Sequence, residues 1–265
     1  MRPVSDIDYA IGNFVQGFED LPDQWAEDAL AWREVEAAVG RARLNLPYAE
    51  GERRRLDLFY PSGRPEGLVM FIHGGYWQKF DRSYWSHFAS GLTARGWAVA
   101  FPSYTLAPEA RICAITREIA RALEKAASLV QGPIRITGHS AGGHLAARMG
   151  CRDVVVDTTA RDRIERIVPI SPVADLRPLL GLSMNQELRL DDAEAAAESP
   201  VLHDAPKAAV TVWVGAEERP VFLDQTRWLS EAWGCEMRLA PGRHHFDVIE
   251  ELFDADSPLV NAILT

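Results

Sequence analysis

The sequence predicts an α/β fold, in which one mainly parallel sheet is covered by helices on both faces. Short apolar runs without polar–apolar alternation, such as residues 68–72 and 164–170, are separated along the chain by stretches with a helical pattern. Strands that are apolar on both faces are typical of a parallel sheet with both faces covered. The 265 residues can bury one large core, and no linker or change in composition divides them. We therefore expect a single domain over residues 1–265.

The expected elements follow this alternation in order. Residues 53–60 alternate in polarity and end at Pro61, which predicts a strand with one solvated face. Further strands are expected over residues 68–72, 98–101, 134–137, 164–170, 210–214 and 236–239. Helices are expected near residues 84–94, 115–130, 143–149, 221–233 and 246–252. In such a sheet, ligands bind where loops leave the carboxyl ends of the strands.

Two segments fall outside the alternation. Within residues 1–40, the stretch 25–37 predicts an N-terminal helix, and residues 175–202 predict a helical insertion between two strands. We expect both to form a small partial lid over the strand ends, and packing behind the sheet is the alternative for the first.

Charge and composition narrow the class of ligand. The 28 basic and 38 acidic residues give a net charge of −10, which disfavours nucleic acid and anionic membranes and leaves a small-molecule substrate as the expectation. Residues 1–8 lack the apolar core of a signal peptide, and the longest apolar runs are too short to span a bilayer. We therefore expect a cytoplasmic protein.

Cysteine and histidine spacing predicts no metal site and no cofactor. Cys113, Cys151 and Cys235 are an odd number without C-x-x-C spacing, as expected in a reducing compartment. His139 and His144 are five residues apart, whereas two imidazoles on one helical face need a spacing of four.

The motif Gly138-His139-Ser140-Ala141-Gly142 marks Ser140 as the candidate nucleophile. It lies between an expected strand and an expected helix. In G-x-S-x-G the chain passes from strand to helix in one tight turn, so the residues flanking the serine must be small. The serine then stands at a helix N-terminus, where unpaired N–H groups can stabilise negative charge.

Candidate oxyanion donors lie in the segment His73-Gly74-Gly75-Tyr76-Trp77, which follows a strand and resembles the H-G-G-G-type loop of lipases and esterases. The expected donors are the backbone N–H groups of Gly75 and Tyr76, with Gly74 as a possible third, together with the N–H of Ala141 after the nucleophile.

A nucleophilic serine also needs a base and an acid that orients it. His245, after the last expected strand, is the candidate base, and His244 is the alternative. The acid should follow strand 210–214, where we choose Glu218. Glu217 and Asp224 are the other candidates for the acid.

These residues resemble the α/β-hydrolase superfamily, and within it the kynurenine formamidase (arylformamidase) group near the hormone-sensitive-lipase-like esterases. The similar segments extend from about residue 70 to 250: His73–Trp77, Tyr104–Glu109, Gly138–His144, Ser171–Leu179, Asn185–Gln186 and His245–Asp247. H-G-G-Y-W is the discriminating motif, because the broader esterases usually carry a third glycine there. The group usually has aspartate as the acid, whereas this chain has Glu218 at that position.

The resemblance implies an α/β-hydrolase fold and acyl transfer by Ser140, His245 and Glu218. The expected substrate is an N-formyl arylamine such as N-formylkynurenine. Alternatives are a carboxylesterase or thioesterase of short acyl substrates, and a non-catalytic α/β-hydrolase that binds a ligand. Trp77 and His139 are candidate substrate-pocket residues, with buried packing as the alternative role for Trp77. The bulk of Tyr76 is expected to limit the acyl pocket to formyl or acetyl groups.

Overall fold

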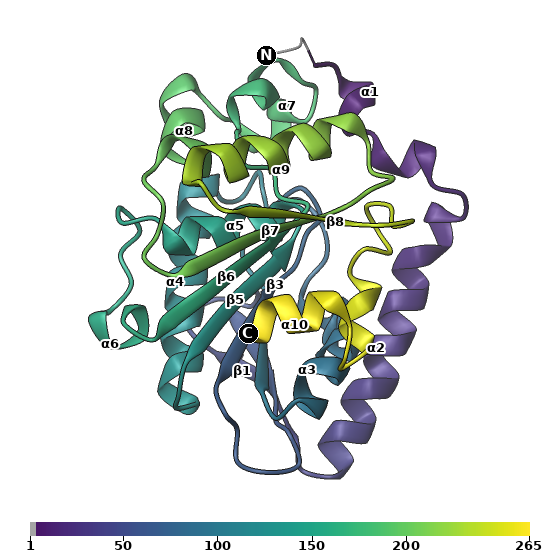
Figure 1. Ribbon diagram of the computed structural model, residues 1–265, viewed down its shortest axis with the longest axis vertical. Coiled ribbons are helices and arrows are strands. Elements are labelled where there is room, and N and C mark those ends of the chain that lie inside the picture. The colour runs from purple at the N-terminus through teal and green to yellow at the C-terminus, as the bar shows by residue number, and fades with distance from the viewer. Residues whose placement is uncertain (1–3) are drawn as a thin grey trace.

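The computed structural model describes residues 4–265, which contain one central eight-stranded sheet (Figure 1). Its strands are β1 (Ala42–Pro47), β2 (Arg55–Phe59), β3 (Leu68–Ile72), β4 (Ala98–Pro102), β5 (Ile134–His139), β6 (Ile164–Ile170), β7 (Ala209–Gly215) and β8 (Glu236–Ala240). Their order across the sheet is β1-β2-β4-β3-β5-β6-β7-β8. Strands β3 to β8 pair in parallel, while β2 pairs antiparallel with both β1 and β4. The predicted mainly parallel α/β fold is confirmed.

Helices cover both faces of this sheet. They are α1 (Asp6–Tyr9), α2 (Leu21–Ala38), α3 (Ser90–Ala94), α4 (Ile112–Leu129), α5 (Ala141–Gly150), α6 (Thr158–Arg161), α7 (Asn185–Leu188), α8 (Asp192–Ala197), α9 (Pro220–Trp233) and α10 (Pro258–Leu264). Buried side chains of α4, α5 and α9 belong to one apolar cluster, and those of α2, α3 and α10 belong to a second. No helix within residues 4–265 combines the length and the apolar character needed to cross a membrane.

Strand β3 shows how the sequence builds this double layer. All five of its residues are buried, so it has no solvated face. Leu68 and Met70 join the cluster under α4 and α5, whereas Val69 and Phe71 join the cluster under α3 and α10. Because successive side chains of a strand point to opposite faces, a continuous apolar run is what a strand between two helix layers requires.

Three expectations about elements are corrected. The helix expected over residues 84–94 is two 3-10 turns and the short α3, and in this arrangement the rings of Trp85 and Phe88 both lie 6.4 Å from that of Phe71. The helix expected over residues 246–252 consists of turns and one 3-10 segment, and the terminal α-helix is α10. The sequence does mark the start of α10, since Ser257 caps this helix and Pro258 is its first residue.

The third correction concerns β2. The sequence predicts a solvated face, but Asp57 is fully buried, because Arg33 and Arg82 both pair with its carboxylate. The edge strand β1, which the sequence analysis did not include, pairs with β2 on its outer side.

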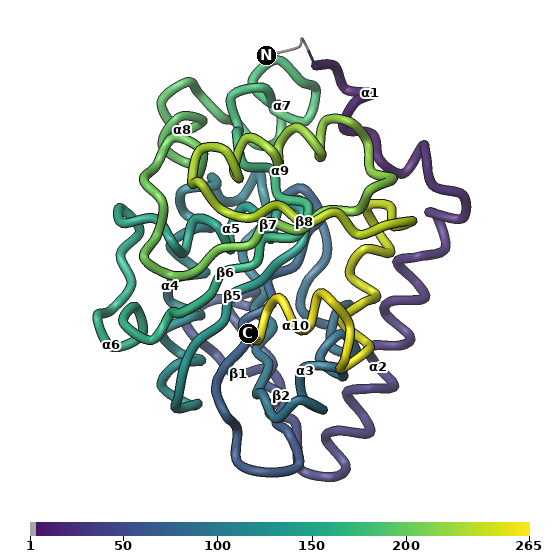
Figure 2. Tube along the Cα trace, viewed as in Figure 1, coloured from purple at the N-terminus to yellow at the C-terminus, as the bar shows by residue number. Residues whose placement is uncertain are grey.

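The N-terminal segment and the insertion lie at the carboxyl-end side of the sheet. In Figure 2 the N-terminal segment, coloured purple, runs from α1 beside α7 and α9 along one side of the molecule into α2. Two 3-10 turns, Ile11–Phe14 and Phe18–Asp20, lie between α1 and α2. Ser183 of the insertion donates two hydrogen bonds to Asp6 of α1, from its backbone N–H (2.7 Å) and its hydroxyl (2.9 Å).

Candidate active site

Ser140 stands alone between β5 and α5 in a backbone conformation that few residues adopt. Its φ of 57° and ψ of −117° let the chain reverse from the strand into the helix within one residue. The turn is tight because α5 lies close to both β3 and β5: a side chain on Gly142 would collide with the carbonyl oxygen of Ile72 in β3, and one on Gly138 in β5 with the carbonyl oxygen of Gly142. The strained serine between obligatory glycines is the geometry of a nucleophile elbow.

His245 and Glu218 form a buried pair. His245 Nδ1 lies 2.6 Å from Glu218 Oε2, and neither residue is more than 6% exposed. The other carboxylate oxygen of Glu218 accepts hydrogen bonds from the Ser171 hydroxyl and from the N–H of Gly215 (3.0 Å). A carboxylate with these donors accepts from Nδ1–H, so Nε2 of His245 keeps its lone pair and can take a proton.

The alternative residues named from the sequence have other surroundings. Glu217 is exposed, and Asp224 pairs with Arg227. His244 Nδ1 lies 3.0 Å from a carboxylate oxygen of Asp247. Ser171 was not foreseen, because it follows β6 and reaches Glu218 across 47 residues of sequence.

The loop after β3 lies against Ser140. Three consecutive residues have positive φ angles: Gly75 (104°), Tyr76 (53°) and Trp77 (58°). A Cβ on Gly74 would lie 3.1 Å from the Cβ of Ser140, which shows how closely the loop approaches the elbow. Ala141 is the first residue of α5, so its N–H has no partner within the helix. That Gly74, Gly75, Tyr76 and Ala141 bind an oxyanion stays a prediction.

The surroundings of the oxyanion loop are neutral and rigid. His73 Nδ1 lies 2.8 Å from the carbonyl oxygen of Gly74, its ring stacks on Tyr104 at 4.3 Å, and burial lowers the pKa of His73 to about 4. The Tyr76 hydroxyl donates a 2.6 Å hydrogen bond to the carbonyl of Tyr9, and burial raises the pKa of Tyr76. His73 therefore supports the loop as an uncharged ring.

Ser140 and His245 line one cavity of about 490 Å³. Its walls are largely aromatic and come from widely separated segments: Tyr9, Phe18, Trp25, Tyr76, Phe80, Trp85 and Phe246. The N-terminal segment supplies one side, where Phe18 stacks on Phe246 at 4.8 Å, and Met184 of the insertion lies at the rim. The site thus lies at the carboxyl ends of β3, β5, β7 and β8, where a parallel sheet binds ligands.

Of the two candidate substrate-pocket residues, only one lines the cavity. His139 lines the cavity, and its ring lies 4.6 Å from that of His245. Trp77 instead is fully buried in the core, where its ring packs edge-on against His144 at 5.2 Å. The positive φ of Trp77 turns its side chain away from the cavity, so the stacking role expected of it is corrected to core packing.

One cluster of possible metal ligands is present among residues 4–265, formed by Cys151, Asp153 and His203. Arg148 donates to both carboxylate oxygens of Asp153, at 3.0 and 2.6 Å, so a cation there would face a guanidinium group. Burial also raises the pKa of Cys151 to about 11, which opposes a thiolate ligand. This cluster does not have the electrostatics of a metal site.

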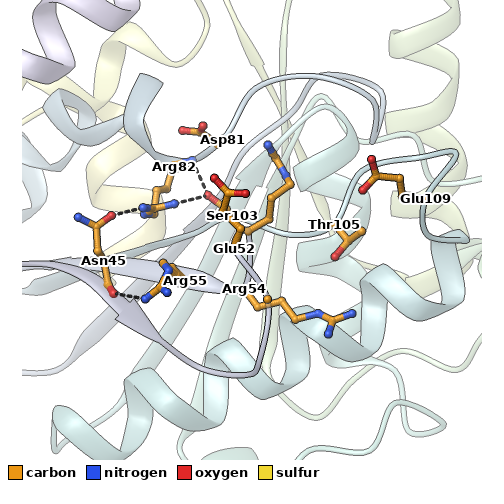
Figure 3. Close-up of a pocket in the computed structure, with 11 residues that line it drawn as sticks. Asn45, Glu52, Arg54, Arg55, Asp81, Arg82, Ser103, Thr105 and Glu109 are labelled. Carbon is orange, nitrogen blue, oxygen red and sulfur yellow. Dashed lines mark hydrogen bonds between the residues drawn. The ribbon is translucent and has the colours of Figure 1, made fainter.

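A second and larger cavity, of about 710 Å³, lies beside β1 and β2 (Figure 3). We refer to it as the polar cleft; Arg53, Arg54, Arg55, Arg82, Asp81, Glu52 and Glu109 are among the residues that line it. Figure 3 shows Arg82 bonded to Asn45 and Ser103, and Arg55 bonded to Asn45.

The sheet order and the serine elbow at its carboxyl edge define this protein as an α/β-hydrolase. Residues 56–225 match the family model described as BD-FAE, and the chain belongs to this family. It is 30% identical to the kynurenine formamidase of Drosophila melanogaster over 85% of this chain and 81% of the relative. It is 29% identical to the kynurenine formamidase of Salmo salar over 92% of both chains.

Solved structures agree with this assignment. A crystal structure from Silicibacter sp. TM1040, described as a "putative thioesterase", is 50% identical and superposes with a TM-score of 0.96 over 98% of both chains. Esterase 2 of Thermogutta terrifontis superposes with a TM-score of 0.66 at 19% identity over 85% of this chain and 97% of the other, which supports the fold. The chain is therefore a hydrolase, and a non-catalytic binding protein is disfavoured.

Proposed function

We propose that this hydrolase transfers an acyl group through Ser140, with His245 as the base and Glu218 as the orienting acid. The observation that carries the proposal is the buried His245–Glu218 pair, whose 2.6 Å hydrogen bond leaves Nε2 of His245 free on the cavity that Ser140 also lines. A serine, a histidine and a carboxylate in these roles are the requirements for nucleophilic catalysis at neutral pH.

In this mechanism Ser140 Oγ forms a bond to the substrate carbonyl carbon while His245 Nε2 takes the hydroxyl proton. The N–H groups of Gly75, Tyr76 and Ala141 bind the resulting oxyanion. His245 then gives the proton to the leaving group as the carbonyl–heteroatom bond breaks, which leaves an acyl-serine. Water, deprotonated by His245, attacks the acyl carbon, and the acid is released with Ser140 restored.

The substrate that fits best is an N-formyl arylamine of the N-formylkynurenine type. Two relatives that cover 85% or more of this chain are kynurenine formamidases, and the cavity is lined by Phe18, Trp25, Phe80, Trp85 and Phe246, which suit an aryl leaving group. Tyr76 also lines this cavity, and we expect its ring to limit the acyl group to formyl or acetyl.

A short-chain thioesterase is the second candidate. It is supported by the 50% identical structure described as a "putative thioesterase". An ester or thioester leaves more easily than an amide, so the same residues serve either reaction.

The test compares the rates of the purified protein on N-formylkynurenine, on acetyl thioesters and on 4-nitrophenyl acetate, with Ser140→Ala as control. Turnover of the formamide that disappears in Ser140→Ala supports the formamidase. Turnover of esters or thioesters without the formamide supports the second candidate. Ser140→Ala with undiminished turnover, and wild type that a fluorophosphonate probe does not label, would overturn the serine mechanism.

A further inference from the structure

His139 occupies the variable position of the elbow, directly before Ser140, and it contacts the loop that carries His245. Its Nε2 lies 2.7 Å from the backbone carbonyl oxygen of His245. A carbonyl oxygen only accepts hydrogen bonds, so Nε2 of His139 carries the proton and donates it. This is a direct link between the strand that presents the nucleophile and the peptide of the candidate base.

The loop that carries His245 has little other support from regular structure. Residues 241–249, between β8 and the 3-10 segment Glu250–Phe253, form turns and contain no strand or helix. Glu218 orients the side chain of His245, but this bond does not hold the backbone of the loop. The N–H of Glu217 also binds this loop, at the carbonyl of Arg243 (2.9 Å), but the bond from His139 acts on the carbonyl of His245 itself and ties it to the residue next to Ser140.

The ring of His139 also packs against the ring of the candidate base. The ring centroid of His245 lies 4.6 Å from that of His139 and 4.2 Å from that of Phe222. His139 is 3% exposed, and burial together with the neighbouring His245 holds its pKa well below the ordinary value for histidine. A neutral His139 can remain beside His245 when His245 takes a proton.

We propose that His139 is a positioning residue for His245: its Nε2–H holds the carbonyl of His245 so that the imidazole faces the hydroxyl of Ser140. The inference rests on the proposed function, in which Ser140 and His245 act together. Since a displacement of about 1 Å between reacting groups can cost about 100-fold in rate, one hydrogen bond between the two loops affects catalysis more than its net energy suggests.

The test uses two replacements that differ in one property. In His139→Gln the amide N–H lies at nearly the reach of Nε2 and can donate to the same carbonyl. In His139→Met the side chain has similar length and no donor. His139→Asn, whose amide is too short to reach the carbonyl, replaces the Met variant if that variant does not fold. Each is assayed for kcat and KM on 4-nitrophenyl acetate and for the rate of labelling by a fluorophosphonate.

We expect His139→Met to lower kcat and the labelling rate by about tenfold to 100-fold with KM within about twofold, and His139→Gln to recover most of the loss. The matched control is His144→Met. His144 is also buried, and its Nε2 lies 2.6 Å from a backbone carbonyl, that of Glu198, which is far from His245 in the sequence. This control should lose stability in a thermal melt but keep kcat within about twofold.

Equal kcat values for His139→Gln and His139→Met would overturn the positioning role, as would a higher KM with unchanged kcat, since that result belongs to a residue that only binds substrate. A loss of kcat in His144→Met equal to that in His139→Met would also overturn it, because general destabilisation would then explain both. The variants Ser140→Ala and His245→Ala distinguish a failure of the positioning role from a failure of the proposed function. If both are inactive while His139→Met equals wild type, only the positioning role fails; if both retain turnover, the proposed function fails.

Discussion

The two cavities of this protein differ in what their polar groups bind. The polar cleft beside β1 and β2 is the larger, at about 710 Å³ against about 490 Å³, and it has more charged side chains. Its guanidinium groups, however, are engaged by the protein: Arg54 pairs with Glu118, and Arg53 donates to the carbonyls of Tyr104 and Phe80. These side chains hold loops together, and Figure 3 shows several of them bonded to one another.

The cavity at Ser140 has few charges, yet its polar groups are arranged around an open space. The carboxylate of Glu218 accepts from Ser171, Gly215 and Nδ1 of His245, so Nε2 of His245 is not engaged by this carboxylate. Size and charge therefore do not identify the site in this molecule. The candidate site is marked instead by a serine with a strained backbone that lines the same cavity as a histidine bonded to a buried glutamate.

The first prediction replaces one buried glutamate in each region. Glu218 accepts from His245, Ser171 and Gly215, and Glu118 accepts from Arg54 and from the N–H and hydroxyl of Thr105. Glu218→Gln should lower kcat by about 10³- to 10⁴-fold, because an amide favours the wrong tautomer of the histidine. Glu118→Gln should keep kcat within about twofold when rates are scaled to folded protein.

Steady-state kinetics with circular dichroism spectra of both variants check this pair. A Glu218→Gln enzyme with more than about one tenth of the wild-type kcat would assign the acid to another carboxylate. Comparable losses in the two variants would mean that the polar cleft takes part in catalysis.

The second prediction is a variant near the polar cleft that loses stability and keeps its activity, the opposite of what Glu218→Gln should do. Asp57 is fully buried, and Arg33 and Arg82 both pair with it. Asp57→Ala leaves two guanidinium groups without their anion, so it should lower the free energy of unfolding by about 3 kcal/mol or more. The kcat of the folded fraction should stay within about twofold, since Asp57 does not line the cavity at Ser140.

Urea unfolding at pH 7 measures the loss, with kinetics below the unfolding transition. If Asp57→Ala keeps wild-type stability, or remains folded and loses most of its kcat, then the two regions do not differ in the way proposed.

These two regions also show how far the sequence alone could lead. Local motifs and the order after successive strands predict Ser140, His245 and Glu218 as the candidate nucleophile, base and acid, and the structure brings His245 and Glu218 within 2.6 Å. Such order is informative because parallel strands bring their carboxyl ends to one edge. The burial of Asp57 could not be read in this way, because its partners are 24 and 25 residues away, on α2 and in a 3-10 turn.

The same reasoning explains why part of the cavity was missed. Its wall from Tyr9 to Trp25 depends on where the N-terminal segment docks, which no local pattern records. Trp77 was misplaced because its side chain direction depends on a positive φ, and sequence patterns do not reveal such an angle at a tryptophan. Local motifs identify chemistry, whereas the surfaces that select a substrate arise from contacts between distant segments.

The third prediction concerns acid. Burial lowers the pKa of His73 and of His87 to about 4 and that of His144 to about 3. In the unfolded chain these groups take up protons near pH 6.5, so the unfolded state binds more protons and stability falls as the pH drops from about 6.5 toward 4. Each histidine contributes up to about 1.4 kcal/mol per pH unit in that range.

Urea unfolding at pH 7, 6 and 5 should show this slope, and His87→Gln should reduce it by up to about 1.4 kcal/mol per pH unit. The polar cleft supplies the comparison. The hydrogen bonds from Ser83 lower the pKa of Asp81 against an opposing effect of burial, so the stability it contributes is present above the ordinary aspartate value of 3.8 and is lost only below it. Asp81→Asn should therefore leave the slope between pH 7 and 5 unchanged. A slope unaffected by His87→Gln would place the acid sensitivity elsewhere.

The last prediction, with the smallest expected effect, concerns the hydroxyl and the ring of Tyr76. It compares one hydrogen bond from a tyrosine hydroxyl to a backbone carbonyl in each region. Tyr76 donates to the carbonyl of Tyr9 at 2.6 Å, and Tyr48 donates to the carbonyl of Ser103, beside the polar cleft, at 2.7 Å. Each bond is worth about 1 kcal/mol, but only the first holds the loop that we propose as the source of oxyanion donors. Tyr76→Phe should thus lower kcat about fivefold, while Tyr48→Phe should lower stability alone.

Rates on 4-nitrophenyl acetate and butyrate distinguish the hydroxyl from the ring. Tyr76→Phe keeps the ring, so its preference for acetate should match that of wild type, whereas Tyr76→Gly should accept butyrate relatively better because the acyl pocket is widened. If the preference is equal in wild type and Tyr76→Gly, the ring of Tyr76 does not set acyl length. If Tyr48→Phe loses as much kcat as Tyr76→Phe, the hydroxyl of Tyr76 has no special role in holding the oxyanion loop.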